Sequence, residues 1–335
     1  MNKKFKNLIL IDAILVGLIA IIIIFFMYIP NQEKTEITFP TPLKEGDKIA
    51  ILAPAGPVDS VLVDSAALVL REIGFEPVIY STAYGKLEYF SGTDAERYAD
   101  LKKAFLDSEI RAILCARGGY GVALILDSLS TLPIEKDPKW VIGFSDISAL
   151  HALMASKGIA SIHSSMARQV ALGPEDPNNK TLFEILRGNF PTYRFAPDSL
   201  NHLGHAEGRL LGGNLAVIQA LIHTPYDIIH PGTILFIEDV SEPIYKIQRI
   251  IYQLRMAGII PNLKGLIIGQ FTDYKPDGMY DTMEEMIAKA LADYPDLPVA
   301  FNVPVGHVDF NVPFIESAKV CLDITPEATI LSFKQ

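Results

Sequence analysis

The chain has 335 residues, of which half are hydrophobic, and its 39 acidic side chains outnumber 29 basic ones. This acidic balance, with no basic run after residue 6, argues against a nucleic-acid-binding protein. Two cysteines, Cys115 and Cys321, are too few for a disulfide framework. Both lie in apolar, strand-like runs, which predicts buried free thiols.

The first part of the chain predicts a membrane anchor. Residues 8–29 are almost wholly apolar, with Asp12 as the one charge, and about 20 such residues suffice for a helix that crosses a bilayer. Three lysines precede this span, so the positive-inside bias predicts a cytoplasmic tail at residues 1–7 and export of the rest. A cleaved signal peptide is the alternative, but the apolar run is too long and no small-x-small cleavage site follows it. We therefore expect an uncleaved, single-pass protein of the cell membrane.

The residues after the anchor, roughly 300, are enough for two domains. Residues 30–45 are polar, contain two prolines and are expected to form a stalk. From residue 46 to 172, short apolar strands alternate with helices, a pattern typical of a parallel sheet covered on both faces. The strands are expected at 48–53, 76–80, 111–116, 140–142 and 159–163, and the main helices at 60–73, at 94–106 with Thr93 as its cap, and after Ser145.

The second half of the chain has a different character. Residues 173–205 are rich in proline and asparagine and lose periodicity, which predicts a linker with one helix around 181–186. Residues 206–335 predict an α/β domain of mixed topology. Its helices are expected to end at 222 and to span 244–256 and 282–291, and its strands to span 233–238, 265–269, 298–302, 318–324 and 329–333.

Ser145 lies on the most informative corner of the chain. The apolar run 140–142 predicts the end of a buried strand, Gly143 permits a tight turn, and apolar residues then recur at helical spacing. A serine on such a strand–turn–helix corner exposes its hydroxyl beside the free N–H groups that begin the helix, as a nucleophile requires. The alternative is that Ser145 merely caps the helix that begins at Asp146.

Three predicted strands of the first half end in loops suited to bind a ligand, because ligands bind at the carboxyl ends of strands in open parallel sheets. In the loop after the third strand, Gly118 and Gly119 could present backbone N–H groups to a developing oxyanion, with the N–H of Asp146 as a further donor. A phosphate-binding turn or plain turn glycines are the alternatives. Neither the G-x-G-x-x-G spacing nor a Walker lysine is present, so we expect no nucleotide site.

A serine nucleophile needs a base, and the base needs an orienting carboxylate. His307 lies directly after a predicted strand, in the segment V-P-V-G-H-V-D-F-N. Glu238 and Asp239 end another apolar strand, where a carboxylate needs a partner. That partner could be the histidine or, as the alternative, Arg249 or Lys246 in a plain salt bridge.

Other histidines are weaker candidates for chemistry. His151, six positions after Ser145, is expected to face away from the hydroxyl. His202 and His205 form an H-x-x-H spacing without a nearby carboxylate, which is a weak metal signal, and we expect no metal site.

Together these residues resemble the LD-carboxypeptidases of peptidoglycan recycling and their relatives, the microcin C self-immunity peptidases. The matching segments follow the family's order through most of the chain after the stalk and are 46–56, 117–121, 143–146, 212–214, 237–239 and 306–307. The resemblance implies a flavodoxin-like N-terminal domain with a parallel sheet, a smaller C-terminal α/β domain, an active site between them, and a homodimer. It implies no cofactor.

The resemblance also assigns roles to residues. Ser145 matches the family's nucleophile, His307 the general base and Glu238 the residue that orients the imidazole. The oxyanion site would be the backbone at Asp146 together with Gly118 or Gly119.

We therefore expect a membrane-anchored serine carboxypeptidase that removes the C-terminal D-Ala from the tetrapeptide stems of peptidoglycan. Arg117, Tyr120 and Asn214 are candidate substrate-binding residues. Arg117 would pair with the terminal carboxylate, with a structural ion pair as its alternative role. The anchor departs from the well-known cytoplasmic members of the family. The alternatives are an immunity peptidase that cleaves an aminoacyl-nucleotide antibiotic, and a non-catalytic protein of the same fold that binds cell-wall peptides.

Overall fold

A computed structural model describes residues 36–334, and residues 37–334 belong to one compact unit. The expected cytoplasmic tail (1–7), the expected transmembrane anchor (8–29) and the first part of the expected stalk lie outside the described residues. Between residues 36 and 334, no helix is both long enough and apolar enough to cross a membrane.

The first sheet has six strands in the order β11-β5-β4-β3-β1-β2. They are β1 (Lys48–Leu52), β2 (Glu76–Ile79), β3 (Ile110–Cys115), β4 (Trp140–Gly143), β5 (Ser161–His163) and β11 (Phe314–Glu316). The first five pair in parallel, and their order is that of flavodoxin-like sheets. The parallel pairing that we expected is confirmed for these five strands, but β11 from the second half of the chain adds an antiparallel edge, so the sheet as a whole is mixed.

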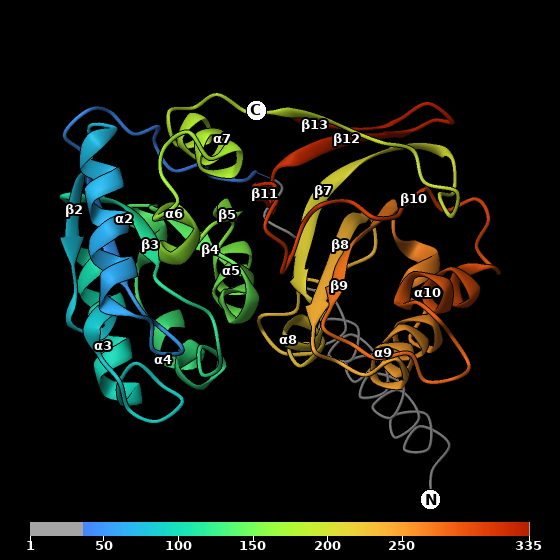
Figure 1. Ribbon diagram of the computed structural model, residues 1–335, viewed down its shortest axis with the longest axis horizontal. Coiled ribbons are helices and arrows are strands. Elements are labelled where there is room, and N and C mark those ends of the chain that lie inside the picture. The colour runs from blue at the N-terminus through green and yellow to red at the C-terminus, as the bar shows by residue number, and fades with distance from the viewer. Residues whose placement is uncertain (1–35, 335) are drawn as a thin grey trace, which may run out of the picture. The chain divides into compact units, whose positions relative to one another are not determined.

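Helices cover both faces of this sheet (Figure 1). They are α2 (Ser60–Glu72), α3 (Asp94–Leu106), α4 (Leu126–Ser130), α5 (Ser148–Ser156), α6 (Ala167–Val170) and α7 (Pro177–Leu186). Successive side chains of a strand point to opposite faces, so Ile49 and Ile51 of β1 pack in one core with α2, whereas Ala50 and Leu52 pack in the other with α3. This two-sided burial explains why the strands are apolar throughout.

The second sheet has seven strands in the order β10-β9-β8-β7-β12-β13-β6. They are β6 (Thr192–Phe195), β7 (Gly204–Asn214), β8 (Thr233–Val240), β9 (Gly265–Thr272), β10 (Val299–Ala300), β12 (Lys319–Ile324) and β13 (Thr329–Lys334), accompanied by α8 (Leu215–Gln219), α9 (Ile244–Met256) and α10 (Met283–Leu291). Strands β7 to β10 are parallel and the other three antiparallel, so the expected mixed topology is confirmed. The C-terminal sheet draws one strand, β6, from the expected linker, and this strand lies at its edge beside β13.

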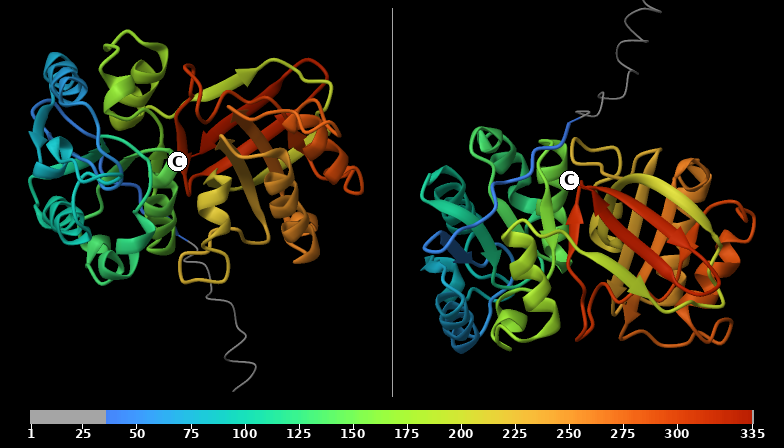
Figure 2. Two further views of the ribbon diagram at one scale, coloured as in Figure 1. Left: turned by 60° about the horizontal axis from the view of Figure 1, so that its bottom comes forward. Right: turned by 90° about the horizontal axis from the view of Figure 1, so that it is seen from above.

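Strand β11 joins the two sheets. It pairs with β5 of the first sheet, and the residues that follow it pair with β7 of the second: Ser317 N donates to Leu210 O at 2.8 Å and Leu210 N donates to Ala318 O at 2.9 Å. Figure 1 shows β11 between the sheets, and both further views in Figure 2 show the two halves of the chain side by side. The carboxyl ends of the parallel strands of one half are thereby held against those of the other.

Two local expectations can be compared directly with the structure. Thr93 caps α3 through a capping box with Glu96, as predicted. Of the two cysteines, Cys115 is fully buried, but Cys321 is only half-buried on β12, so the prediction of a buried thiol is wrong there.

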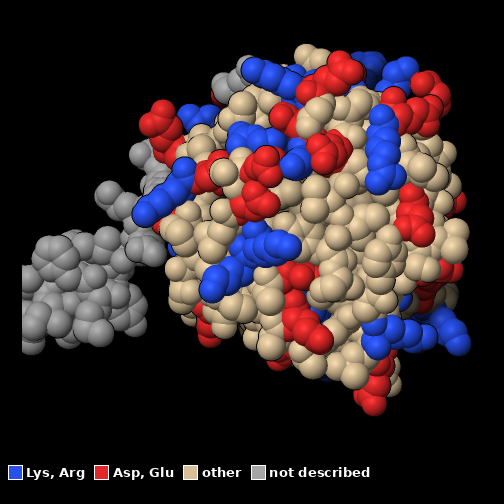
Figure 3. Space-filling view, turned by 90° about the vertical axis from the view of Figure 1, so that its left-hand side faces the viewer, with Lys and Arg blue, Asp and Glu red and all other residues tan. Residues whose placement is uncertain are grey.

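On the face formed by the N-terminal half, acidic and basic side chains are intermingled (Figure 3).

Candidate active site

Ser145 lies between β4 and α5, where the chain turns sharply. It begins a short 3₁₀ turn (Ser145–Ile147), and its φ of 66° lies in the left-handed region that residues other than glycine rarely adopt. Neither this turn nor α5 has a side-chain cap, and among the described residues the Ser145 hydroxyl has no hydrogen-bond partner. The capping role is therefore excluded, and the geometry is that of a serine presented on an elbow.

Gly118 of the loop after β3 packs directly against Ser145. A Cβ at position 118 would lie 2.7 Å from the Ser145 Cβ and 2.9 Å from its Oγ, so only glycine fits there. None of the backbone hydrogen bonds outside helices and strands uses the N–H of Gly118, Gly119 or Asp146 as a donor. These three N–H groups therefore remain available beside the Ser145 hydroxyl, as an oxyanion site requires.

The side chain of Asp146 ties this glycine loop to the elbow. Its Oδ2 accepts a hydrogen bond from Val122 N at 2.9 Å, and Gly118 O in turn accepts one from Gly56 N at 2.9 Å. Burial raises the pKa of Asp146, and the Val122 hydrogen bond and the Arg97 charge partly offset this effect. The loops at the ends of β1, β3 and β4 thus form one connected surface around Ser145.

Glu238 and His307 meet in the second half. Glu238 is fully buried in β8, and its Oε2 accepts a hydrogen bond from His307 Nδ1 at 2.7 Å. A Cβ at Gly306 would lie 2.8 Å from both Cβ and Oε2 of Glu238, so the glycine before the histidine permits this approach. Burial by itself lowers the pKa of His307, but the hydrogen bond to Glu238 and the charges of the nearby acids outweigh it and raise the pKa above its ordinary value.

The register between β8 and β9 shifts between Ile237 and Asp239, so Glu238 lies at an irregularity of the strand. Such irregularities change the direction in which a side chain points. Asp239 points to the other side, where it accepts hydrogen bonds from Asn214 Nδ2 at 3.0 Å and Ala216 N at 2.9 Å. Burial raises the pKa of Asp239 to about 6 despite these bonds. The salt bridges that we considered as alternatives are not formed, since Lys246 pairs with Glu242 and Arg249 lies over Tyr245.

Two contacts bring the halves of the site together. The ring of Phe144, next to Ser145, meets the ring of His307 edge-on with centroids 4.9 Å apart. Ser148 Oγ, at the start of α5, accepts a hydrogen bond from Asn214 N at the end of β7 at 2.9 Å. Sequence reasoning missed Phe144 and Ser148, because neither has a local signal beyond its place beside Ser145.

Behind Ser145, two histidines and a glutamate are fully buried. His151 faces away from the hydroxyl, as expected, with Nε2 2.8 Å from Gly143 O, and burial lowers its pKa to about 4. Burial and the neighbouring histidines hold the pKa of His163 well below the ordinary range, whereas burial raises that of Glu316 well above it. Neutral forms of all three are therefore favoured. His151 and His163 are fully buried, whereas His307 is partly exposed and oriented by Glu238, so His307 is the described histidine best suited to be the base.

The three expected substrate-binding residues differ in their surroundings. Arg117 is exposed beside the glycine loop and uses one Nη to donate to Pro57 O at 2.7 Å, and Tyr120 is exposed with its ring 5.9 Å from that of Phe90. Asn214 is buried: its Oδ1 caps α8 and its Nδ2 binds Asp239. These bonds favour a structural role for Asn214 and leave Arg117 and Tyr120 accessible.

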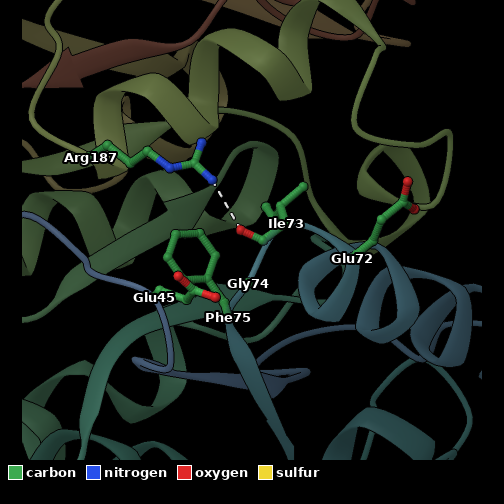
Figure 4. A pocket seen from close by; sticks show the side chains of 6 residues that line it. All are labelled: Glu45, Glu72, Ile73, Gly74, Phe75 and Arg187. Carbon is green, nitrogen blue, oxygen red and sulfur yellow. Dashed lines mark hydrogen bonds between the residues drawn. The ribbon is translucent and has the colours of Figure 1, made fainter.

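A separate surface pocket of about 320 Å³ lies in the N-terminal half, lined by Glu45, Glu72, Ile73, Gly74, Phe75 and Arg187. Figure 4 shows Arg187 donating to Ile73 O across it, at 3.1 Å. None of its lining residues belongs to the Ser145 or His307 loops, so it is distinct from the candidate site.

Comparisons with known proteins cover both halves of the site. The LD-carboxypeptidase N-terminal domain matches residues 49–164, and the LD-carboxypeptidase C-terminal domain matches residues 207–322. The chain is 31% identical to a probable murein peptide carboxypeptidase of Bacillus subtilis over 300 residues, 87% of this chain and 93% of the relative. It is 28% identical to the murein tetrapeptide carboxypeptidase of Pseudomonas aeruginosa, over 78% of this chain and 88% of the relative.

Solved structures agree in fold. The crystal structure of muramoyltetrapeptide carboxypeptidase from Oxalobacter formigenes has a TM-score of 0.78 at 25% identity and covers 86% of this chain and 99% of that one. The microcin C7 self immunity protein has a TM-score of 0.77 at 21% identity, with 89% of this chain and 99% of that one covered, which shows a shared fold alone.

Proposed function

The chain belongs to the LD-carboxypeptidase family of serine peptidases, and on that premise we propose that it removes the C-terminal D-Ala from peptidoglycan tetrapeptides, with Ser145, His307 and Glu238 as its catalytic triad. The observation that carries the proposal is the left-handed backbone of Ser145, packed on Gly118 and next to the Phe144 ring that contacts His307. The site thus contains the free hydroxyl of Ser145 and a histidine, His307, that is already hydrogen-bonded to the buried carboxylate of Glu238.

In the proposed reaction, Ser145 Oγ attacks the carbonyl carbon of the bond that precedes D-Ala. His307 donates its Nδ1–H to Glu238, so Nε2 is the nitrogen that accepts the serine proton. The negative charge of the tetrahedral intermediate is stabilised by N–H groups of Asp146 and Gly118 or Gly119. The imidazolium then protonates the amine of D-Ala as the C–N bond breaks, and water hydrolyses the acyl-enzyme with His307 as base again.

Substrate binding is proposed to use the exposed rim of the glycine loop. Arg117 keeps guanidinium donors free beyond its bond to Pro57 and is positioned next to Gly118, so it is suited to pair with the carboxylate of the terminal D-Ala. Tyr120 offers an exposed ring on the same loop for the apolar part of the stem peptide.

The proposal extends to the location and assembly of the enzyme. Residues 8–29 are apolar and follow three lysines, which supports an anchor with the N-terminus in the cytoplasm and the peptidase outside. Peptidoglycan stems are exposed on that side of the membrane. A homodimer is proposed from the resemblance to the family.

The decisive experiment follows D-Ala release from a purified tetrapeptide by the full chain in detergent. Ser145→Ala should abolish release and leave the fold intact, because alanine has the same backbone restrictions and the hydroxyl makes no internal bond. Ser156→Ala, a serine at the far end of α5, is the matched control and should keep wild-type activity.

Near-normal release by Ser145→Ala would show that the nucleophile is assigned wrongly. A wild-type chain that binds the tetrapeptide without releasing D-Ala would instead support the non-catalytic alternative. A tetrapeptide that ends in L-Ala should be a poor substrate, which tests the stereochemistry of the proposed cleavage.

A further inference from the structure

Four polar side chains that can bind metal ions gather on the exposed face of β7 and β12. In the antiparallel register His205 lies opposite Asp323, and Glu207 lies opposite Cys321. Residues two apart on a strand share a face, so the two cross-strand pairs are neighbours, while Ala206 and Leu322 point into the core. In the view from above no helix lies over β12 and β13 (Figure 2).

Three of these side chains already converge on one point. Their ligand atoms lie within 4.8 Å of one another: His205 Nδ1 is 2.6 Å from Asp323 Oδ1, Cys321 Sγ is 3.3 Å from Asp323 Oδ2, and Sγ is 3.8 Å from Nδ1. Tetrahedral Zn²⁺ with ordinary bond lengths separates sulfur from nitrogen or oxygen ligands by about 3.6 Å and nitrogen from oxygen by about 3.4 Å. Both sulfur distances are close to this requirement. His205 contacts Oδ1 of Asp323 and Cys321 contacts Oδ2, so the carboxylate must move away from the imidazole and present one oxygen to the metal.

The surroundings of His205 complete the arrangement. Its second ring nitrogen, Nε2, lies 3.9 Å from Glu207 Oε1, and Lys334 Nζ holds that oxygen at 2.7 Å. Metal-bound histidines usually donate their other N–H to a carboxylate, which fixes the ring and increases the basicity of the ligand. Glu207 is positioned for this role, and Lys334 orients it.

We infer that His205, Cys321 and Asp323 form a surface site for Zn²⁺, with Glu207 as the partner of the histidine and the fourth coordination position open to water. A thiolate and an imidazole beside one carboxylate select zinc over magnesium or calcium, which prefer oxygen ligands alone. His205 and Asn214 are nine residues apart on β7, about 30 Å along an extended strand, so the zinc site is remote from Ser148 and the catalytic residues.

Metal binding requires the thiolate of Cys321. A thiol that binds the metal must first lose its proton, so metal binding releases a proton. Metal affinity should therefore fall steeply as the pH is lowered.

The test is a titration of the full chain in detergent with Co²⁺, a spectroscopic substitute for zinc, observed through the thiolate-to-cobalt charge-transfer band in the near ultraviolet. Wild type and Cys115→Ala, which removes the buried cysteine, should give a band that saturates at one equivalent and disappears when Zn²⁺ is added. Cys321→Ser should give no band. His205→Ala and Asp323→Asn should each weaken binding by about tenfold or more, while D-Ala release stays at the wild-type rate in all three.

Several results would overturn the site. These are no band in wild type, a band that persists in Cys321→Ser, saturation only at millimolar metal, or equal affinity in wild type and His205→Ala. Circular dichroism of each variant shows whether it folds, and an oxygen-ligand control with Mg²⁺ should not displace cobalt. Since the readout is metal binding, the result is independent of whether the proposed peptidase activity is correct.

Discussion

At residue scale, Ser145 combines strain with exposure. A left-handed backbone costs a residue other than glycine on the order of 1–3 kcal/mol, and it persists only where the surroundings hold it. Here β4 on one side, α5 on the other and the close approach of Gly118 impose that conformation. Neither the 3₁₀ turn nor α5 is capped by this hydroxyl, so it remains free to react.

The protonation of His307 should set the acid limit of activity. A general base must be neutral, so kcat/KM falls as the pH drops through the pKa of the imidazole. Although burial lowers this pKa, the bond to Glu238 and the charges of Glu238, Asp239 and Asp273 raise it overall. We expect the acid limb of kcat/KM for D-Ala release to lie above about pH 6.5, the ordinary histidine value.

Two variants separate the causes of this shift. Asp273→Asn removes an exposed charge that forms no hydrogen bond to the ring, so it should move the acid limb to lower pH and preserve the plateau rate. Glu238→Gln should move the limb further and also lower the plateau severely, because the imidazole loses its orienting carboxylate. An acid limb that is unchanged in both variants would contradict the assignment of His307 as the base.

At the scale of elements, α5 is the connection between the two halves of the site. The hydroxyl of its first residue, Ser148, accepts a hydrogen bond from Asn214 N at the end of β7. The hydroxyl of its last residue, Ser156, donates to Leu153 O one turn back, at 2.8 Å. The chain therefore offers two serines on one helix, one with a long-range partner and one with a local partner.

Replacement of these two serines should have different effects. Ser148→Ala leaves the buried Asn214 N–H without an acceptor, which should lower the free energy of unfolding by about 1–3 kcal/mol. It should also lower kcat/KM, because the end of β7 is no longer held against the elbow. Ser156→Ala should change stability by about 0.5 kcal/mol or less. Urea unfolding and D-Ala release measure both effects, and equal values for the two variants would exclude a connecting role for Ser148.

At the scale of the whole molecule, the proposed anchor determines which substrates the enzyme can reach. An external protease added to intact cells should digest the region after Pro30, because the positive-inside bias exports it. Complete protection in intact cells, with digestion only after lysis, would reverse the orientation and favour a cytoplasmic role. Residues 8–29 should be retained in the mature protein. A start after residue 27 would identify a cleaved signal peptide.

Local elements and the candidate catalytic residues could be predicted from the amino-acid sequence. Periodicity located helices such as α3 and α9, and Thr93 was predicted as the cap of α3 because a threonine directly precedes the helical pattern. Ser145, Glu238 and His307 became candidates because each lies at or after the end of an apolar strand, and in parallel sheets such ends lie at one edge.

The pairing of distant segments became apparent in the folded chain alone. Strand β11 leaves its own half to become an antiparallel edge of the first sheet, and its sequence has no feature that names β5 as its partner. The same holds for Asn214 on Ser148 and for His205 opposite Asp323, which sequence reasoning treated as a histidine without a carboxylate. Strand register depends on the packing of whole faces of a sheet rather than on the residues of one segment. For this reason the sequence alone did not predict the contacts that hold the two halves together, nor those that create the proposed zinc site.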